Sequence, residues 1–211
     1  MINGPVGENA KMNFRELVIG KRVIRLVGLV HRKTPESAIS PMRNFSELVE
    51  FQPQAILVET GKASLELSEF IWKDSKGMTP ERFCSEHSDV NESLAIAVRE
   101  EFKMDTNSVL PIDVDPLRTR LGLAKSSLLH PIESLILISR FHGKGGEVRS
   151  LEETQAWRDR FKRSCPHAFE ILFTAREEHM SEEIRRLSAH VDRCAVLVGL
   201  SHVEALYDRL V

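Results

Sequence analysis

Short apolar runs alternate along this chain with segments in which apolar residues recur at helical spacing. The apolar runs are rich in β-branched residues, which is typical of strands buried on both faces. They lie at 23–30, 55–58, 109–112 and 194–198. Because a strand–helix–strand order favours parallel pairing with helices on the faces, we expect an α/β fold with a central, mostly parallel sheet flanked by helices.

The second half of the chain is more helical than the first. Pro116 and Pro131 mark the starts of two helices, and capping-box patterns at 150–153 and 174–177 mark two more. These helices follow one another with little strand-like sequence between them. We therefore expect a helical insertion in the second half of the α/β fold.

Two polar stretches interrupt the helical patterns. The segments 73–90 and 142–150 contain Gly or Pro, and they predict irregular loops. The remaining pattern is continuous, and a chain of 211 residues most simply folds around one substantial core. We expect a single domain over residues 1–211.

The composition is that of an ordinary soluble globular protein, with 42% hydrophobic residues and a net charge of −2. This balance gives no support to a nucleic-acid or membrane partner, although a local basic patch is compatible with it. Cys84, Cys165 and Cys194 lie far apart and outside any CxxC pair, so we expect reduced thiols and a cytoplasmic setting. The chain shows neither the apolar stretch of a secretion signal near its start nor a run long enough for a membrane helix.

Two of the predicted strands end in the same GxxH signature, at Gly28–His31 and Gly199–His202. If these strands are neighbours in a parallel sheet, His31 and His202 meet at its carboxyl edge, where open α/β sheets build their sites. Imidazole side chains at such an edge bind metal or transfer protons. The alternative is that each histidine caps a helix or satisfies a loop backbone. Gly28 and Gly199 permit a tight turn and a close backbone approach.

Carboxylates follow two further strands in the same way. Glu59 comes directly after the run 55–58, and Asp113 follows the run 109–112. A carboxylate beside two histidines suits a divalent metal with an open position for water, and a remaining carboxylate can take the proton of that water. The alternative for Glu59 is an acid in the first turn of the next helix. Asp113 is expected to be structural because Arg118 and Arg120 are close in sequence.

Two other conspicuous segments are expected to be ordinary. The segment His142–Glu147 is glycine-rich, but it lacks the P-loop ending and a preceding strand, so no nucleotide cofactor is expected. The basic cluster at 158–163 is interpreted as a solvated helix face rather than a nucleic-acid site.

Six short segments, taken in order, resemble the TraB/PrgY family, which is related to the TIKI proteins and more remotely to erythromycin-esterase-like and ChaN-like proteins. The match spans nearly the whole chain. Val114 departs from it, because an arginine is usual there, and the turn at 60–62 lacks the family's common arginine. The matching segments are Gly28–His31, Gln52–Glu59, Asn91–Ala97, Ile112–Leu121, Arg176–Met180 and Gly199–His202.

The resemblance implies a metal-dependent hydrolase of peptide or amide bonds. TIKI relatives are described as metal-dependent proteases, and TraB-type relatives are linked to peptide-pheromone shutdown. Erythromycin-esterase relatives imply instead a metal-independent ester hydrolysis through His and Glu. Carried over by position, His31, His202 and Glu59 are the expected ligands of a divalent ion such as Mn, Co or Zn.

The same resemblance implies catalytic roles for Glu59, Glu177 and Arg176. Glu59 or Glu177 serves as the base, and Arg176 orients a substrate carbonyl or carboxylate, or pairs structurally with Glu59. Asp113 and the glycines of the two GxxH segments are expected to support the site.

A non-catalytic regulatory module of the TraB type, which binds a peptide or small ligand at the same site, is the alternative function. It is favoured by the lack of a complete nucleophile motif and by the departure at Val114. Either function has a peptide or small molecule as its partner, and neither fixes the oligomeric state. Sequence spacing does not establish that His31 and His202 converge.

Overall fold

A five-stranded sheet forms the centre of the computed structural model, which describes residues 14–29, 39–87, 91–141 and 151–211. The strand order is β1-β2-β5-β3-β4. Four of these strands run parallel, and β1 pairs antiparallel with β2 at one edge. The expected α/β fold with a mostly parallel sheet is therefore confirmed. The strands are β1(Phe14–Ile19), β2(Arg22–Leu29), β3(Ala55–Val58), β4(Val109–Pro111) and β5(Arg193–Gly199).

The edge strand β1 was not predicted from the sequence. Its residues include Arg15 and Glu16, and only Leu17 is buried, so neither a continuous apolar run nor a clean alternation marks it. The β1–β2 hairpin turns at Gly20, whose φ of 65° lies in the left-handed region that glycine adopts without steric cost.

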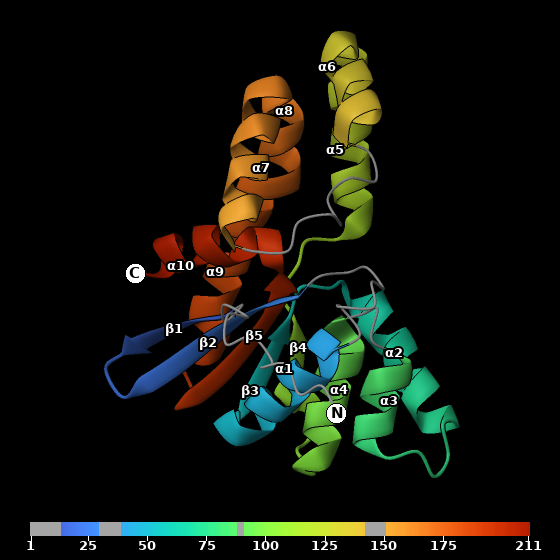
Figure 1. Ribbon diagram of the computed structural model, residues 1–211, viewed down its shortest axis with the longest axis vertical. Coiled ribbons are helices and arrows are strands. Elements are labelled where there is room, and N and C mark those ends of the chain that lie inside the picture. The colour runs from blue at the N-terminus through green and yellow to red at the C-terminus, as the bar shows by residue number, and fades with distance from the viewer. Residues whose placement is uncertain (1–13, 30–38, 88–90, 142–150) are drawn as a thin grey trace, which may run out of the picture.

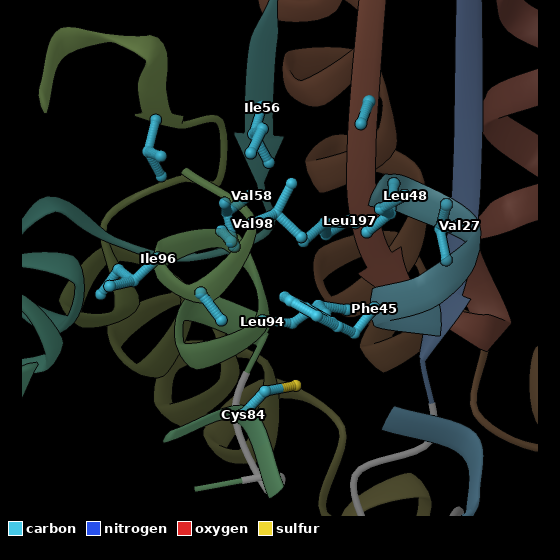
Figure 2. Packing of buried hydrophobic residues seen from close by; sticks show 14 of the residues in the cluster. Val27, Phe45, Leu48, Ile56, Val58, Cys84, Leu94, Ile96, Val98 and Leu197 are labelled. Atoms are coloured by element: carbon cyan, nitrogen blue, oxygen red, sulfur yellow. The ribbon is translucent and has the colours of Figure 1, made fainter. Parts of the chain in front are cut away.

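One face of the sheet is covered by the helices that connect β2, β3 and β4. Figure 2 shows sheet residues such as Ile56 and Leu197 packed against Leu48 and Phe45 of α1 and Leu94 of α4. The stretch 94–98 of α4 is buried throughout, because α4 lies between the sheet and neighbouring helices. These helices are α1(Ile39–Phe51), α2(Lys62–Asp74), α3(Pro80–Glu86) and α4(Asn91–Glu101).

The opposite face is covered by α9(Ala175–Ser188) and α10(Val203–Leu210). Met180 and Ile184 of α9 and Leu206 of α10 are completely buried against Leu26 and Val196 of the sheet. Since α9 leads into β5 and α10 follows it, this layer is built around the central strand of the sheet.

The expected helical insertion rises from the sheet as two groups of helices, seen at the top of Figure 1. Aromatic residues Phe161, Phe169 and Phe173 form a separate small core between these helices. The members are α5(Pro116–Leu129), α6(Pro131–Ile136), the π-helical turn η2(Leu137–Phe141), α7(Leu151–Ser164), α8(Pro166–Phe169) and the π-helical turn η4(Glu170–Thr174).

Two local predictions were wrong, and one lies outside the described residues. The segment 73–90 was expected to be an irregular loop, but it contains α3. Pro80 is the first residue of this helix, and the side chain of Thr79 caps it by accepting from the backbone N–H of Arg82. Thr174 was expected to cap a helix, but the chain is already helical before it, and its side chain makes no capping bond. The predicted loop at 142–150 is not among the described residues.

Within the described ranges, no single helix has the length and apolar composition needed to cross a membrane. The segments Pro116–Leu129 and Pro131–Ser139 meet these criteria only when taken together, and they are bent by 116° at their junction.

Candidate functional site

The two strands that carry the GxxH signatures are neighbours in the sheet. β2 and β5 pair in parallel, with Gly28 opposite Val198 and Leu29 opposite Gly199, so their carboxyl ends lie side by side. This is the arrangement that the repeated signature predicted. His31 lies outside the described residues, and its approach to His202 therefore stays a prediction.

His202 lies in the short 3-10 helix η5(Leu200–His202), directly after β5, and only 3% of its surface is exposed. Its Nδ1 is 2.8 Å from Oε1 of Glu177. Because a carboxylate can only accept, Nδ1 carries the proton of this bond. The other nitrogen, Nε2, lies 3.4 Å from Oε1 of Glu59, and the ring packs against Phe173 with centroids 5.2 Å apart. Both imidazole nitrogens therefore face carboxylates.

Glu59 lies at the carboxyl end of β3, where the backbone of Gly199 and the side chain of Arg176 donate to it. Its Oε2 accepts from the backbone N–H of Gly199 at 2.5 Å, and its Oε1 accepts from Nη2 of Arg176 at 2.6 Å. The first bond ties the end of β3 to the end of β5 through the backbone of Gly199. The alternative interpretation, an acid that serves only the first turn of α2, does not describe these contacts.

Arg176, in the first turn of α9, is clamped between Glu59 and Asp113. Its Nε and Nη2 donate to the two carboxylate oxygens of Asp113 at 3.0 and 2.6 Å. Burial alone would lower the pKa of the guanidinium, but the bonds and charges of Asp113 and Glu59 outweigh it and raise that pKa. Asp113 was expected to be structural because of Arg118 and Arg120; its partner is instead Arg176, which is distant in sequence.

Glu177 reaches the site from the same helical turn, and Arg158 of α7 lies behind it. The two guanidinium Nη atoms of Arg158 donate to Oε1 and Oε2 of Glu177 at 2.6 and 3.1 Å, and Nη1 also donates to the backbone carbonyl of Ser201. Burial would raise the pKa of Glu177, but the hydrogen bonds from His202 and Arg158 prevail and lower it. The carboxylate is therefore ionised and fixes the orientation of the His202 ring.

Arg158 was missed by the sequence analysis, which assigned the cluster 158–163 to a solvated face. Arg158 is only 7% exposed. It lies on the same side of α7 as the buried residues Thr154 and Phe161, which follow helical spacing. The helical spacing of these residues therefore indicated in the sequence that Arg158 is buried, and a buried cation requires an acidic partner.

The π-helical turn η4 contributes a backbone acceptor to the site. A π-helical turn breaks the regular pairing of an α-helix and occurs often at functional sites. Here the carbonyl of Leu172 accepts from Nη1 of Arg176 at 3.3 Å. Glu177, which the sequence pattern paired with a capping Thr174, points into the network instead.

Glu92, from one of the family-like segments, lies beside this network rather than within it. It is buried in the first turn of α4 and accepts from the hydroxyl groups of Thr60 and Ser64. Because Thr60 follows Glu59, these bonds fasten α4 to the turn that presents Glu59.

Around His202, the described carboxylates of the network outnumber its guanidinium groups. The carboxylates of Glu59, Asp113 and Glu177 face the two guanidinium groups of Arg158 and Arg176. An uncompensated buried charge is costly, and a lone pair on Nε2 would face a lone pair of the Glu59 carboxylate. A proton on Nε2 would let the His202 ring donate toward Glu59 as Nδ1 donates to Glu177.

The described residues do not by themselves fit a metal ion. Among them, no group of three or more His, Cys, Asp or Glu residues is arranged to hold one. Of the expected ligands, His202 and Glu59 approach each other, but Arg176 places a positive charge 2.6 Å from the Glu59 oxygen that faces His202. This charge opposes a divalent cation at the same oxygen. Since His31 lies outside the described residues, the predicted metal site stays a prediction.

No family model and no curated protein matches this chain. The resemblance to the TraB/PrgY family therefore stays a prediction that is based on the short ordered segments, and the geometry described above is the basis of the functional argument.

Proposed function

We propose that this protein hydrolyses peptide or amide bonds, with Glu59 as general base and His202 as general acid. The observation that carries the proposal is the 3.4 Å separation between Oε1 of Glu59 and Nε2 of His202 at the carboxyl edge of the sheet. Open α/β folds bind their ligands outside the carboxyl ends of the strands, and a base paired with an acid at that edge can move protons to and from a bound ligand.

The proton movements in this reaction balance within the pair. Glu59 takes a proton from water as the water oxygen attacks the carbonyl carbon, and His202 gives its Nε2 proton to the leaving nitrogen as the C–N bond breaks. The proton on Glu59 then returns to His202 across the contact between them. The products are a carboxylic acid and an amine, and the enzyme is restored.

Arg176 is the group we assign to the developing oxyanion. Its bonds to Asp113, Glu59 and the Leu172 carbonyl use four of the five N–H donors of a guanidinium among the described residues. One donor on Nη1 is left for a substrate oxygen. With 17% of its side chain exposed, Arg176 is also the most accessible member of the network. A fixed donor aimed at the developing charge stabilises the transition state more than a donor that must first reorient.

Glu177, Arg158 and Asp113 are positioning residues in this proposal. Glu177 and Arg158 fix the ring of His202, and Asp113 holds Arg176. Glu177 was predicted as the alternative base. Burial raises its pKa, but the hydrogen bonds from His202 and Arg158 lower it overall, which makes Glu177 a weaker base, and its side chain is 3% exposed against 9% for Glu59. We therefore assign the role of base to Glu59.

The test is amide hydrolysis by the purified wild type and its Glu59→Gln variant, using a panel of aminoacyl-coumarin amides and unstructured peptides. We expect turnover that falls at least about 100-fold in the variant, as loss of a general base predicts. Glu69→Gln is the matched control, because it removes a carboxylate paired with the buried Arg99 outside the site.

Retention of full activity in Glu59→Gln would refute the assignment. A folded wild type that binds peptides but cleaves none of them would favour the non-catalytic binding module instead. Circular dichroism of each variant separates a loss of chemistry from a loss of fold.

A metal-dependent version of the same hydrolase is the second candidate, favoured by one observation. Histidines that bind metal usually donate their other N–H to a carboxylate, as Nδ1 of His202 does to Glu177. This version requires His31 as a further ligand. The metal-dependent and metal-free versions are distinguished by elemental analysis after incubation with Mn, Co or Zn, and by activity after chelation and readdition of the metal. The metal-dependent enzyme should bind an ion, and His31→Ala and His202→Ala should each abolish this binding.

A further inference from the structure

The helices α5 and α6 expose an unusual number of large apolar side chains. Each of seven such residues between Leu117 and Ile138 is at least 60% exposed. Scattered apolar residues are ordinary on a protein surface, but a concentration on one short segment marks an interaction site. We call this set the α5–α6 surface; its members are Leu117, Leu121, Leu128, Leu129, Ile132, Leu135 and Ile138.

The α5–α6 surface is distinct from the face by which these helices attach to the protein. Leu123 and Ile136 pack toward the small core of Phe161 and Phe169. Glu133 also turns inward, where its carboxylate accepts from the backbone N–H of Ala168 at 2.7 Å. The helices therefore have a docked side, and the apolar residues of the α5–α6 surface are additional to it.

The exposed polar positions of α5 carry only one sign of charge. Arg118, Arg120 and Lys125 are exposed, and α5 contains no acidic residue. Glu133, the acidic residue of α6, is engaged with α8. Anionic lipid headgroups attract exposed basic side chains, and exposed apolar side chains beside them can enter the boundary between headgroups and acyl chains.

We propose that the α5–α6 surface docks this protein on an anionic lipid surface. Exposure is greatest near the bend between the helices, at 85% for Leu128 and 75% for Ile132. Figure 1 shows this bend at the far end of the helices that rise from the sheet. A protruding apolar tip enters a lipid interface without steric hindrance from the rest of the protein. The 14 residues of α5 rise only about 21 Å, so the pair dips into one leaflet rather than crossing a bilayer.

Charge argues against a second copy of this chain as the occupant. In a helix-to-helix contact along Leu117, Leu121 and Leu128, the flanking residues of both copies include Arg118, Arg120 and Lys125. Like charges that face each other across such a seam are unfavourable. Anionic lipid headgroups attract the same residues. The sequence analysis expected no membrane partner from the overall charge balance, but it left room for a local basic patch of this kind.

The test is cosedimentation of the full chain with vesicles of phosphatidylcholine, with and without about one-third phosphatidylserine. We expect the wild type to bind the phosphatidylserine vesicles and salt to weaken this binding. Leu128→Gln combined with Ile132→Gln should lower the partition coefficient at least about tenfold, because two apolar anchors are lost. Arg118→Gln combined with Lys125→Gln should remove the preference for phosphatidylserine.

The matched control is Leu67→Gln combined with Phe70→Gln on α2, where the exposed fractions are 60% and 68%. This control should bind vesicles as the wild type does. Absence of wild-type binding, or equal loss in the control, would overturn the proposal. A dimer of the wild type would also overturn the proposal if the wild type binds no vesicles. Sedimentation velocity would detect this dimer, and Leu128→Gln combined with Ile132→Gln would convert it to monomer.

Discussion

Replacing Arg158 by methionine should destabilise the fold strongly, because it leaves Glu177 buried without its guanidinium partner. The side chains of Arg158 and Glu177 are only 8% and 3% exposed. Methionine retains an apolar stem that can pack near Phe173, over which the Arg158 guanidinium lies at 4.7 Å. The substitution therefore removes mainly the charge and its hydrogen bonds to Glu177 and the Ser201 carbonyl.

The expected loss follows from the cost of breaking a buried ion pair at one partner, which is ~3–5 kcal/mol in the free energy of unfolding. His202 lowers this cost by donating to Glu177, so a value near ~3 kcal/mol is expected. Arg186→Met is the control, since Arg186 pairs with Glu183 on the exposed face of α9. Exposed pairs of this kind contribute little to the free energy of unfolding.

Urea unfolding followed by circular dichroism measures both values. The combined variant Arg158→Met with Glu177→Gln should lose less than the sum of the single variants, because it leaves no uncompensated charge. A loss of less than ~1 kcal/mol in Arg158→Met, equal to that of the Arg186 control, would refute the reasoning that Arg158 neutralises a buried carboxylate.

Three further predictions concern pH, thiol reactivity and packing. Since the pKa of Glu177 is lowered from its ordinary 4.5, the contribution of Glu177 to stability is present above about pH 4.5 and is lost as the pH falls through the folded pKa. The urea midpoint should therefore fall between pH 7 and pH 3, and Glu177→Gln should make the midpoint depend less steeply on pH. Burial raises the pKa of Cys84 and Cys194 to about 12, so neither should react with iodoacetamide at pH 8 until the protein unfolds, and rapid labelling of the native protein would contradict their burial. Leu57→Ala should cost ~2–5 kcal/mol in urea unfolding, because Leu57 is completely buried in the central sheet, whereas Val18→Ala at the exposed edge should cost little.

The central architecture was predictable because it depends on local patterns. The apolar runs that became β2, β3 and β5 are buried on both faces, and such runs leave a continuous signal in the sequence. β1 left none, because one face of this edge strand is exposed and it carries charged residues. The helix α3 was missed because its apolar face is short, with Phe83 and Cys84 as its buried members.

The residues of the candidate site that follow strands were predictable from the sequence. Glu59 and His202 follow strands, and a parallel sheet brings strand ends to one edge, so their proximity follows from topology. The guanidinium partners come from helices whose direction over the sheet no local pattern specifies. Pairing with Glu59 was one of the two alternatives for Arg176, but the roles of Arg158 and of Asp113 as partners were not foreseen.

The position of β5 in the sheet has a consequence for how the chain folds. β5 pairs with β2 on one side and β3 on the other, although the chain places β2 and β3 far earlier. Until β5 arrives, β2 and β3 each keep an open edge, and the large loops that β5 must close make this step slow. Open edges at that stage can also pair with other chains, which is a route to aggregation. The candidate site shares this timing, because Gly199 and His202 reach Glu59 only when the last strand enters the sheet.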